Sequence, residues 1–524
     1  MLDAIVIGAG FSGLYMLHRL RGLGMSAAVF EAGDGVGGTW YWNRYPGARC
    51  DSESHYYSFS FDDDLQQEWR WSERYPRQPE ILAYLNHVAD RFDLRRDIRF
   101  GTRVTEASFD DGWTVLTERG DELRARFLIG AVGCLSSANV PEIPGLDAFD
   151  GDWYHTGRWP HEDVDFAGKR VGVIGTGSTG IQAIPVIAEQ AAHLTVFQRT
   201  PNFSVPARNA PLDEEFQAAV RAEYAEIRAL QRETSNGHPF RISPRNAVDT
   251  PPDQRREIYE AAWRRGGLRF RAAFNDLLSS EEANDTAAEF IREKIRETVR
   301  DPEVAERLLP HDHPFAAKRP PIDTGYFETY NRDDVTLVDV RETPIVEITS
   351  DGLRTTEAEH PLDALVFATG FDAMTGPMLG IDVRGANGTL AEKWRDGPQS
   401  YLGLQVAGFP NLFIITGPGS PSVLTNMPTS IEQHVDWIAR CLGDLRDNGF
   451  ERIEATEEAE RAWGEEVQEV ANRTLLPQAK SSWYLGANVP GKPRVFMPYA
   501  GGLAHYAALC DEAADHDYAG FHRS

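Results

Sequence analysis

The 524-residue chain has few cysteines and no long apolar run. Its four cysteines, Cys50, Cys134, Cys441 and Cys510, lie far apart in the sequence and form no C-x-x-C pair. This spacing disfavours a disulfide framework, a cysteine-based zinc site and a dithiol redox centre, so we expect no metal site. No stretch reaches the roughly 18–20 apolar residues of a membrane-spanning helix, and the N-terminus lacks the pattern of a signal peptide. We therefore expect a cytoplasmic protein that does not bind a membrane.

Positive charge is also scarce in this chain. Lysine and arginine together number 53, against 80 aspartates and glutamates, which gives a formal net charge of −27. Such an acidic chain disfavours binding to nucleic acid or to an anionic membrane surface. A phosphate group must therefore be held by backbone N–H groups and a few arginines. Hydrophobic residues make up 41% and charged residues 25%, which is typical of a globular protein, and the length predicts several domains.

A glycine-rich turn follows a short apolar run near the N-terminus. Residues 4–7 are apolar without alternation, which predicts a strand buried on both faces. The turn then lets a pyrophosphate approach the N-terminus of the next helix. Glu31 ends the following strand at the spacing where a carboxylate accepts hydrogen bonds from ribose hydroxyls. The pattern favours FAD over the alternative of a turn without a ligand, and its binding residues would be Gly8, Gly10, Ser12, Gly13 and Glu31.

A second turn of the same design follows the apolar residues 171–174. At the ribose position it carries Arg199 in place of the acid at Glu31. A guanidinium can hold a 2′-phosphate by charge-assisted hydrogen bonds, whereas a carboxylate would repel it. The second nucleotide is therefore predicted to be NADP(H), although an arginine at a strand end can also be only solvated. The turn itself comprises Gly175, Thr176, Gly177, Ser178, Thr179 and Gly180.

Four other stretches allow a plain structural interpretation. The glycines and aromatics of residues 35–42 could let the backbone approach a flat ring system, or could be a turn with core aromatics. Asp51 beside Arg49 could be a surface ion pair. Residues 209–314 have helical periodicity and show no chemistry. Residues 318–321 are Lys-Arg-Pro-Pro, where the prolines force extended backbone and the basic pair could simply lie on the surface.

Between the two turns, residues 149–160 read F-x-G-x-x-x-H-x-x-x-W-P. This matches every fixed position of the fingerprint of the type I Baeyer–Villiger monooxygenases, which belong to the flavin-containing monooxygenases. The chain resembles that family over essentially its whole length, including residues 37–40, 368–370 and 483–488, and most resembles its phenylacetone- and steroid-oxidising members. In the family the fingerprint is a hinge linker, so we assign it no proton transfer. Its residues here are Phe149, Gly151, His155, Trp159 and Pro160.

The resemblance implies an α/β fold with two Rossmann-like dinucleotide-binding domains, one for FAD and one for NADP. A helical subdomain is expected as an insertion, and the FAD domain is expected to be discontinuous. The expected division is 1–138 and 364–524 for the FAD-binding domain, 139–208 and 315–363 for the NADP-binding domain, and 209–314 for the helical insertion. In this division the apolar strand and glycine exit of residues 364–370 return to the FAD domain.

The activity implied by the resemblance is NADPH- and O2-dependent oxidation of a small-molecule ketone to an ester or lactone. NADPH reduces FAD, O2 adds at flavin C4a, and the resulting peroxide attacks the ketone carbonyl. No obligate protein partner is expected. One alternative is an enzyme of the same fold that oxygenates nitrogen or sulfur. Another is a catalytically idle nucleotide-binding protein, whereas a disulfide reductase is disfavoured by the cysteine spacing.

The resemblance also implies roles for individual residues. Arg319 matches the family's permanent cation beside the peroxide, and Asp51 matches the carboxylate that orients it. Lys318, with Arg199 and Thr200, matches the contacts to the NADP 2′-phosphate. Pro320-Pro321 departs from the pattern, because it is stiffer than the corresponding loop of phenylacetone-type relatives. Further cofactor contacts are implied at Gly38, Thr39, Trp40, Arg49, Tyr57, Val104, Gln182 and Met427, and substrate contacts at Val423, Leu424, Met427 and Trp483.

Overall fold

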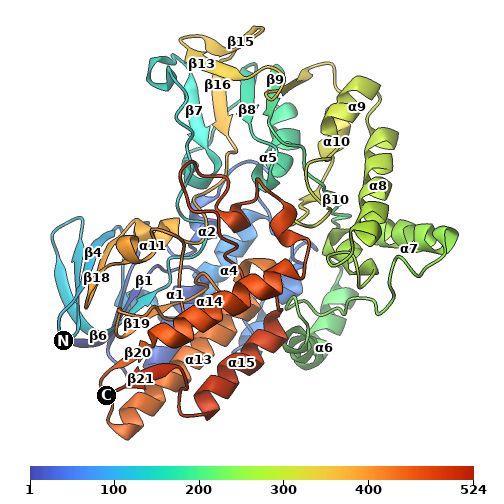
Figure 1. Ribbon diagram of the computed structural model, residues 1–524. Coiled ribbons are helices and arrows are strands. Elements are labelled where there is room, and N and C mark those ends of the chain that lie inside the picture. The colour runs from blue at the N-terminus through green and yellow to red at the C-terminus, as the bar shows by residue number, and fades with distance from the viewer.

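The computed structural model describes residues 1–524, and the lower part of the molecule in Figure 1 is built on a nine-stranded mixed sheet. Its strands, in sheet order, are β18 (Gly388–Thr389), β17 (Asp382–Gly385), β4 (Val104–Phe109), β5 (Trp113–Thr117), β6 (Glu122–Gly130), β1 (Leu2–Ile7), β2 (Ala27–Phe30) and β3 (Ile98–Arg99), with β19 (Leu412–Ile414) also beside β6. The predicted buried strand forms β1, which pairs in parallel with β2 and β6. The carboxyl ends of β1 and β6 therefore open toward the same edge of the sheet.

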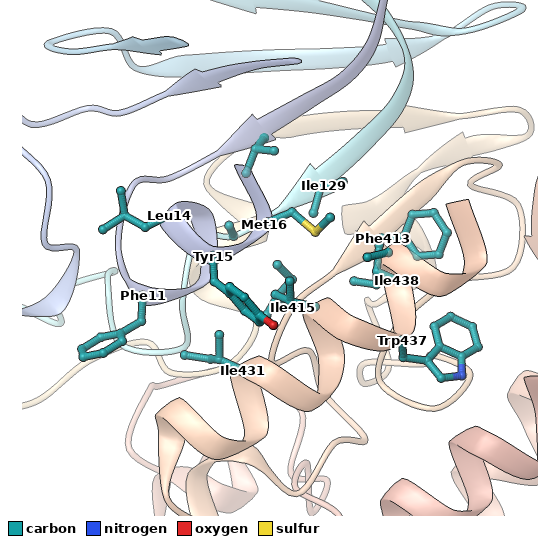
Figure 2. Packing of buried hydrophobic residues seen from close by; sticks show 14 of the residues in the cluster. Phe11, Leu14, Tyr15, Met16, Ile129, Phe413, Ile415, Ile431, Trp437 and Ile438 are labelled. Carbon is teal, nitrogen blue, oxygen red and sulfur yellow. The ribbon is translucent and has the colours of Figure 1, made fainter. Parts of the chain in front are cut away.

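Helix α1 (Phe11–Gly22) fixes the first glycine-rich turn by packing between this sheet and α13 (Met427–Asn448). Figure 2 shows Tyr15 of α1 pointing toward Ile431 of α13, whereas Met16 lies beside Ile129 of the sheet. Burying each such side chain stabilises the fold by roughly 1.5–3 kcal/mol. The remaining helices of this part are α2 (Thr39–Trp42), α3 (Asp63–Glu68), α4 (Gln78–Arg91), α11 (Gly376–Leu379), α12 (Leu390–Lys393), α14 (Glu457–Asn472) and α15 (Leu503–Asp515), together with the short 3₁₀ helix η8 (Trp483–Leu485).

A parallel five-stranded sheet forms the upper part of the molecule in Figure 1. Its order is β12 (Val335–Asp339), β9 (His193–Gln198), β8 (Arg170–Ile174), β16 (Ala364–Phe367) and β7 (Asp152–His155), and α5 (Ser178–Ala188) packs on it. The expectation that residues 364–370 return to the FAD domain is wrong for the strand, because β16 pairs with β7 and β8. An apolar strand with a glycine exit fits the centre of either sheet, so its composition could not decide between them.

Helices dominate the stretch between β9 and β12 of the five-stranded sheet. Residues 209–314 contain α6 (Glu214–Glu233), α7 (Pro252–Arg265), the 3₁₀ helix η5 (Gly267–Ala273), α8 (Glu281–Thr298) and α9 (Pro302–Leu308). Asp213, Ser280 and Asp301 cap α6, α8 and α9, because each side chain accepts a hydrogen bond from a backbone N–H of the first turn. Helix α6 contacts α3 and α15, whereas α8 contacts α10 (Tyr326–Thr329). The helices of residues 209–314 therefore contact helices in both the lower and the upper part of the molecule.

Three small sheets complete the structure. They are the parallel pair β10 (Val205–Pro206) and β11 (Ile322–Asp323), the antiparallel set β13 (Ile345–Thr349), β14 (Gly352–Thr355) and β15 (Glu359–Pro361), and the antiparallel pair β20 (Ile453–Ala455) and β21 (Phe521–Arg523). The four cysteines are all buried and unpaired. None of the helices combines the length and the apolar character that crossing a membrane requires.

Candidate active site between two dinucleotide turns

A cavity of about 1920 Å³ joins the two glycine-rich turns. It is lined by the loop after β1, by the loop after β8 and by the segments that follow β6 and β16. All four segments leave the carboxyl ends of parallel strands, which is where open α/β sheets bind their ligands. Asp51 and Arg319 line this cavity together with the two turns.

The first turn depends on glycine at three points. Gly8 has a φ of +106°, and a Cβ there would lie 2.5 Å from the carbonyl oxygen of Ala131. A Cβ on Gly13 would lie 1.8 Å from the carbonyl oxygen of Gly8, so this glycine lets α1 pack directly on the turn. A Cβ on Gly10 would lie 3.2 Å from the Cα of Gly38. Gly8, Gly10, Ser12, Gly38, Thr39 and Trp40 line the cavity, whereas Gly13 lies behind it.

Glu31 lies at the edge of the first turn and is 5% exposed. Its carboxylate accepts hydrogen bonds from the backbone N–H groups of Ala9, at 2.8 Å, and Gly33, at 2.7 Å. Burial raises the pKa of Glu31 despite these two bonds, which act in the opposite direction. The carboxylate thus ties the glycine turn to the end of β2 while still lining the cavity.

The second turn repeats this construction. Gly175 has a φ of +110°, and a Cβ on Gly180 would lie 2.3 Å from the carbonyl oxygen of Gly175. The hydroxyl of Thr176 donates a hydrogen bond to the carbonyl oxygen of Thr200 at 3.0 Å, which joins the turn to the end of β9. The cavity is lined by Gly175, Thr176, Gly177, Ser178, Thr179, Gln182 and Thr200, and Gly180 lies behind it like Gly13.

A cluster of positive charge lies beside the second turn. Arg199 is exposed, lines the cavity and has no ion pair or side-chain hydrogen bond. Lys318 lies close enough for the two charges to interact. Burial lowers the pKa of Lys318, and Arg199 lowers it further, against the opposing effect of Asp312. Two cations that lie at the same cavity and make no ion pair form a suitable site for a phosphate.

Arg319 and Asp51 form a bidentate ion pair at the junction of the two turns. Arg319 Nε donates to Asp51 Oδ2 at 2.6 Å, and Nη2 donates to Oδ1 at 2.8 Å. The two side chains are 27% and 21% exposed, and both line the cavity. Although burial lowers the pKa of Arg319, the charge and hydrogen bonds of Asp51 raise it above its ordinary value. The surface interpretation of Lys318-Arg319 is therefore wrong for Arg319.

The alternative pairing of Asp51 with Arg49 is also wrong. Arg49 Nη1 lies 3.9 Å from Glu73 Oε2, whereas Asp51 pairs with Arg319. The backbone of Arg49 instead contacts Gln182 of α5, whose Nε2 donates to the Arg49 carbonyl oxygen at 3.1 Å. Gln182 also accepts a hydrogen bond from the hydroxyl of Tyr45 at 2.8 Å. These bonds connect the second turn with the segment that carries Asp51.

The prolines after Arg319 are buried, and the chain runs from them directly into β11. The backbone N–H of Val205 donates to the carbonyl oxygen of Pro321 at 3.0 Å. Strands β10 and β11 then pair in parallel. Asp51 therefore holds the side chain of Arg319. The backbone after Arg319 is held by two prolines, whose rings fix φ, and by the pairing of β11 with β10.

The fingerprint residues lie mostly behind the cavity. His155 ends β7, and its Nδ1 accepts a hydrogen bond from the backbone N–H of Gly157 at 3.0 Å. Its Nε2 lies 3.4 Å from the hydroxyl of Thr369, which donates to the Asn139 carbonyl oxygen at 2.6 Å. Burial and then the charge of Arg158 lower the pKa of His155 to about 4. The neutral ring of His155 thus connects the segment after β7 with Thr369 and, through Thr369, with Asn139.

A backbone contact explains the fingerprint glycine, Gly151, and packing explains the fingerprint tryptophan, Trp159. A Cβ on Gly151 would lie 2.4 Å from the carbonyl oxygen of Asp363. Trp159 is buried with its ring 5.2 Å from that of Tyr154, and it lines the cavity. Phe149, Gly151, His155 and Pro160 do not line the cavity.

The expected substrate and remaining cofactor contacts are mostly brought together. Trp483, Val423, Met427, Tyr57 and Val104 all line the cavity, and the Val423 carbonyl oxygen lies 3.5 Å from Arg319 Nη1. Leu424 does not line it, although it packs in the same apolar cluster as Val423. Asn139, Thr416 and Asn488 line the cavity without having been predicted. They belong to irregular segments, which carry no periodic pattern that could have marked them.

Known flavin enzymes are similar to this chain along nearly its whole length. A Baeyer–Villiger monooxygenase of Pseudooceanicola batsensis is 44% identical over 98% of this chain and 95% of its own. A phenazine N-monooxygenase of Lysobacter antibioticus is 45% identical over 99% of this chain and 96% of its own. The solved structure of an oxidised steroid monooxygenase bound to NADP has a TM-score of 0.95 and 55% sequence identity, and covers 100% of this chain and 99% of that chain.

A profile of the family described as pyridine nucleotide-disulphide oxidoreductase matches residues 5–234. That range contains both glycine-rich turns. The chain shares the nucleotide-binding architecture of that family but has no dithiol pair, because its cysteines are dispersed, buried and unpaired.

Proposed function

The chain belongs to the Baeyer–Villiger monooxygenases, which contain FAD and use NADPH and O2, and we propose that Arg319 and Asp51 form its catalytic pair. The reaction inserts one oxygen atom of O2 between the carbonyl carbon of a ketone and a neighbouring carbon, giving an ester or lactone. The other oxygen atom leaves as water, and NADPH is oxidised to NADP⁺. The observation that carries the assignment is the bidentate ion pair where the two turns meet.

We propose that the first turn holds FAD. The contact between Gly10 and Gly38 leaves no room for side chains where a pyrophosphate would meet the helix N-terminus, and Glu31 suits an unphosphorylated ribose. When bound, FAD supplies electron transfer from NADPH and the activation of O2. The chain residues proposed to contact it are Gly8, Gly10, Ser12, Glu31, Gly38, Thr39, Trp40, Arg49, Asp51, Tyr57, Val104 and Met427. Gly13 supports the turn from behind, where it lets α1 pack on Gly8.

The second turn is the proposed NADP(H) site. The exposed, unpaired guanidinium of Arg199 supports a preference for the 2′-phosphate, with Lys318 and Thr200 beside it. Gln182 links this turn to the Asp51 segment through Arg49. The remaining residues proposed to contact the nucleotide are Gly175, Thr176, Gly177, Ser178 and Thr179. Gly180 supports the turn from behind, where it lets α5 pack on Gly175.

Arg319 has the properties that an oxyanion-stabilising group needs. Its positive charge is permanent, and Asp51 fixes two of its three nitrogens before any ligand arrives. A fixed cation of this kind stabilises negative charge that develops on the carbonyl oxygen of the substrate. Asp51 positions the guanidinium, and Trp483, Val423 and Met427, with Leu424 behind them, shape the space for the ketone.

We propose a division of the chain that follows the two sheets. Residues 1–138 and 371–524 would form the FAD-binding unit, and residues 139–208 and 315–370 the NADP-binding unit. The boundary at 370 follows from the pairing of β16 with β7 and β8. Residues 209–314 would be the inserted helical unit, and the fingerprint residues 149–160 would link the two nucleotide units.

A single assay tests this function. Purified protein, which should be yellow, is given NADPH and phenylacetone, cyclohexanone or progesterone, and NADPH absorbance and product mass are followed together. An ester or lactone one oxygen heavier than the ketone, formed in step with NADPH consumption, is expected. NADPH consumption that yields only hydrogen peroxide with every ketone would contradict the ketone assignment and leave the flavin assignment intact.

Oxygenation of nitrogen or sulfur is a second candidate function for the same site. The similarity to a phenazine N-monooxygenase supports it, because that enzyme is as close in sequence as the Baeyer–Villiger relative. Phenazine and methyl phenyl sulfide, offered in the same assay, separate the two. N-oxide or sulfoxide formation without any ester from the ketones would favour this second candidate.

A further inference from the structure

Arg158 is a cation at the main cavity to which neither nucleotide site yet assigns a role. Its side chain is exposed, lines the cavity, and makes no ion pair and no side-chain hydrogen bond. It stands within the fingerprint stretch of residues 149–160, but at one of the positions that the fingerprint leaves open. An accessible guanidinium without a partner at a ligand cavity is suited to bind an anionic group of the ligand.

The fingerprint residues on both sides of Arg158 fix its backbone. Arg158 is the last residue of the 3₁₀ helix η4 (Thr156–Arg158), which follows β7 directly. The backbone N–H of Gly157 donates to His155 Nδ1 at 3.0 Å, and Trp159 is buried against Tyr154. The side chain of Arg158 therefore leaves the cavity wall from a fixed point.

Helix η4 lies against the first turn of α5. The hydroxyl of Thr156 lies 3.4 Å from that of Thr179, the second residue of α5, and Ser178 and Thr179 line the same cavity as Arg158. A dinucleotide places its pyrophosphate at the helix N-terminus after such a glycine-rich turn. Because two residues span at most about 7 Å, the Cα of Arg158 lies close enough to Thr156 for the guanidinium to reach this turn.

The other cations of the cavity that make no ion pair are already accounted for. Arg199 and Lys318 lie beside the second turn and are proposed to bind the 2′-phosphate. Arg103 also lines the cavity, but the residue before it donates its backbone N–H to the carbonyl oxygen of Glu31 at 2.8 Å, which places Arg103 at the first turn. Arg158 is therefore the cation that remains for the pyrophosphate at the second turn.

We propose that Arg158 binds the pyrophosphate of NADP(H), together with the backbone N–H groups of the first turn of α5. The inference rests on the proposed NADP(H) site and adds a residue to it. A guanidinium suits this group, because its planar fork donates to two phosphate oxygens at once. NADPH and NADH share the pyrophosphate, so Arg158 strengthens the binding of both nucleotides, whereas Arg199 distinguishes between them.

Binding of NADP⁺ and NAD⁺ to the oxidised, FAD-loaded enzyme tests the proposal directly. Isothermal titration calorimetry measures both dissociation constants for the wild type, Arg158→Gln and Arg158→Lys. Arg264→Gln is the matched control, because Arg264 is exposed on α7, makes no ion pair and does not line the cavity. We expect Arg158→Gln to raise the Kd of both nucleotides by the same factor, about tenfold or more. Arg158→Lys should raise both Kd values less, because it keeps the charge.

Flavin reduction gives a second readout that needs no ketone. Stopped-flow absorbance follows the reduction of the bound FAD by NADPH, by NADH and by 1-benzyl-1,4-dihydronicotinamide, which carries no phosphate. In Arg158→Gln the apparent affinity for NADPH and for NADH should fall together, about tenfold or more. Reduction by the benzyl compound should proceed at the wild-type rate, because it does not depend on a pyrophosphate contact.

Three outcomes would overturn the role of Arg158. They are Kd values for both nucleotides equal to those of Arg264→Gln, a loss confined to NADP⁺, which would place Arg158 at the 2′-phosphate, and a loss of FAD with unchanged nucleotide binding. If Arg158→Gln retains too little FAD to be titrated, Arg158→Lys decides, and wild-type binding of both nucleotides by that variant overturns the proposal. A wild type that neither binds NADP⁺ nor is reduced by NADPH would instead overturn the proposed NADP(H) site.

Discussion

Arg319 and Asp51 are 268 residues apart in the chain, yet they form a bidentate ion pair with distances of 2.6 and 2.8 Å. The third nitrogen of the guanidinium, Nη1, has only long contacts, at 3.5 Å to the Val423 carbonyl oxygen and 3.4 Å to that of Thr425. Hydrogen bonds at these distances are weak. One edge of the Arg319 guanidinium, Nε and Nη2, is therefore firmly held by Asp51, whereas Nη1 can donate to a ligand.

Replacement of Arg319 by lysine should separate flavin reduction from oxygen insertion. Lysine keeps the charge but cannot make the two parallel bonds to Asp51, so the cation loses its fixed position. We expect ester formation to fall by roughly 100-fold or more, while NADPH still reduces the flavin. Stopped-flow absorbance measures the reduction and mass spectrometry measures the product. Ester formation at the wild-type rate would show that Arg319 is not the stabilising cation.

Asp51→Asn tests the other half of the pair. The substitution leaves Arg319 partly buried without its counter-charge, which should cost about 1–3 kcal/mol of stability. Ester formation should also fall by about tenfold or more, because the guanidinium is no longer oriented. Differential scanning fluorimetry and the ester assay check the two effects. Asp152→Asn is a suitable control, since Asp152 belongs to an exposed pair with Lys169. A variant as active as the wild type would remove Asp51 from the site.

Arg199→Glu should reverse the preference for the phosphorylated nucleotide. The new carboxylate would repel a 2′-phosphate and accept hydrogen bonds from a free ribose hydroxyl. We expect kcat/KM for NADPH to fall by about 10–100-fold. NADH serves as the internal control, and its kcat/KM should stay the same or rise. A similar loss with both nucleotides would mean that Arg199 supports the fold and does not read the phosphate.

Local sequence predicted the two nucleotide turns well, because glycine spacing encodes the backbone contacts directly. Gly13 and Gly180 each stand where a Cβ would collide with the carbonyl oxygen of the first glycine of its own turn. The two glycines that meet this requirement lie within six residues of each other in the sequence. The difference between Glu31 and Arg199 at the ribose position is equally local. The resemblance to a known family then added the pairing of Asp51 with Arg319, which the residues alone did not favour.

Long-range arrangements were not predictable in the same way. The strand at 364–367 could belong to either sheet, since its composition specifies burial and not its neighbours. A cytoplasmic location stays a prediction.

His155 should make the stability of the protein depend on pH in a defined direction. Burial and Arg158 hold its pKa at about 4 in the folded state, against about 6.5 when unfolded. Between pH 6.5 and 4 the unfolded chain binds a proton at His155 that the folded chain does not. Stability is therefore fully present above pH 6.5 and is lost as the pH falls, by up to about 3 kcal/mol.

Replacing His155 by asparagine isolates this contribution, since the asparagine oxygen can still accept the hydrogen bond from Gly157. We expect the melting temperature of the variant to fall less than that of the wild type between pH 7.5 and 5. His522→Asn is the control, because His522 is exposed, and it should follow the wild type. If His155→Asn loses as much stability on acidification as the wild type, His155 takes up a proton as readily in the folded protein as in the unfolded chain. The lowered pKa of the fingerprint histidine would then be wrong.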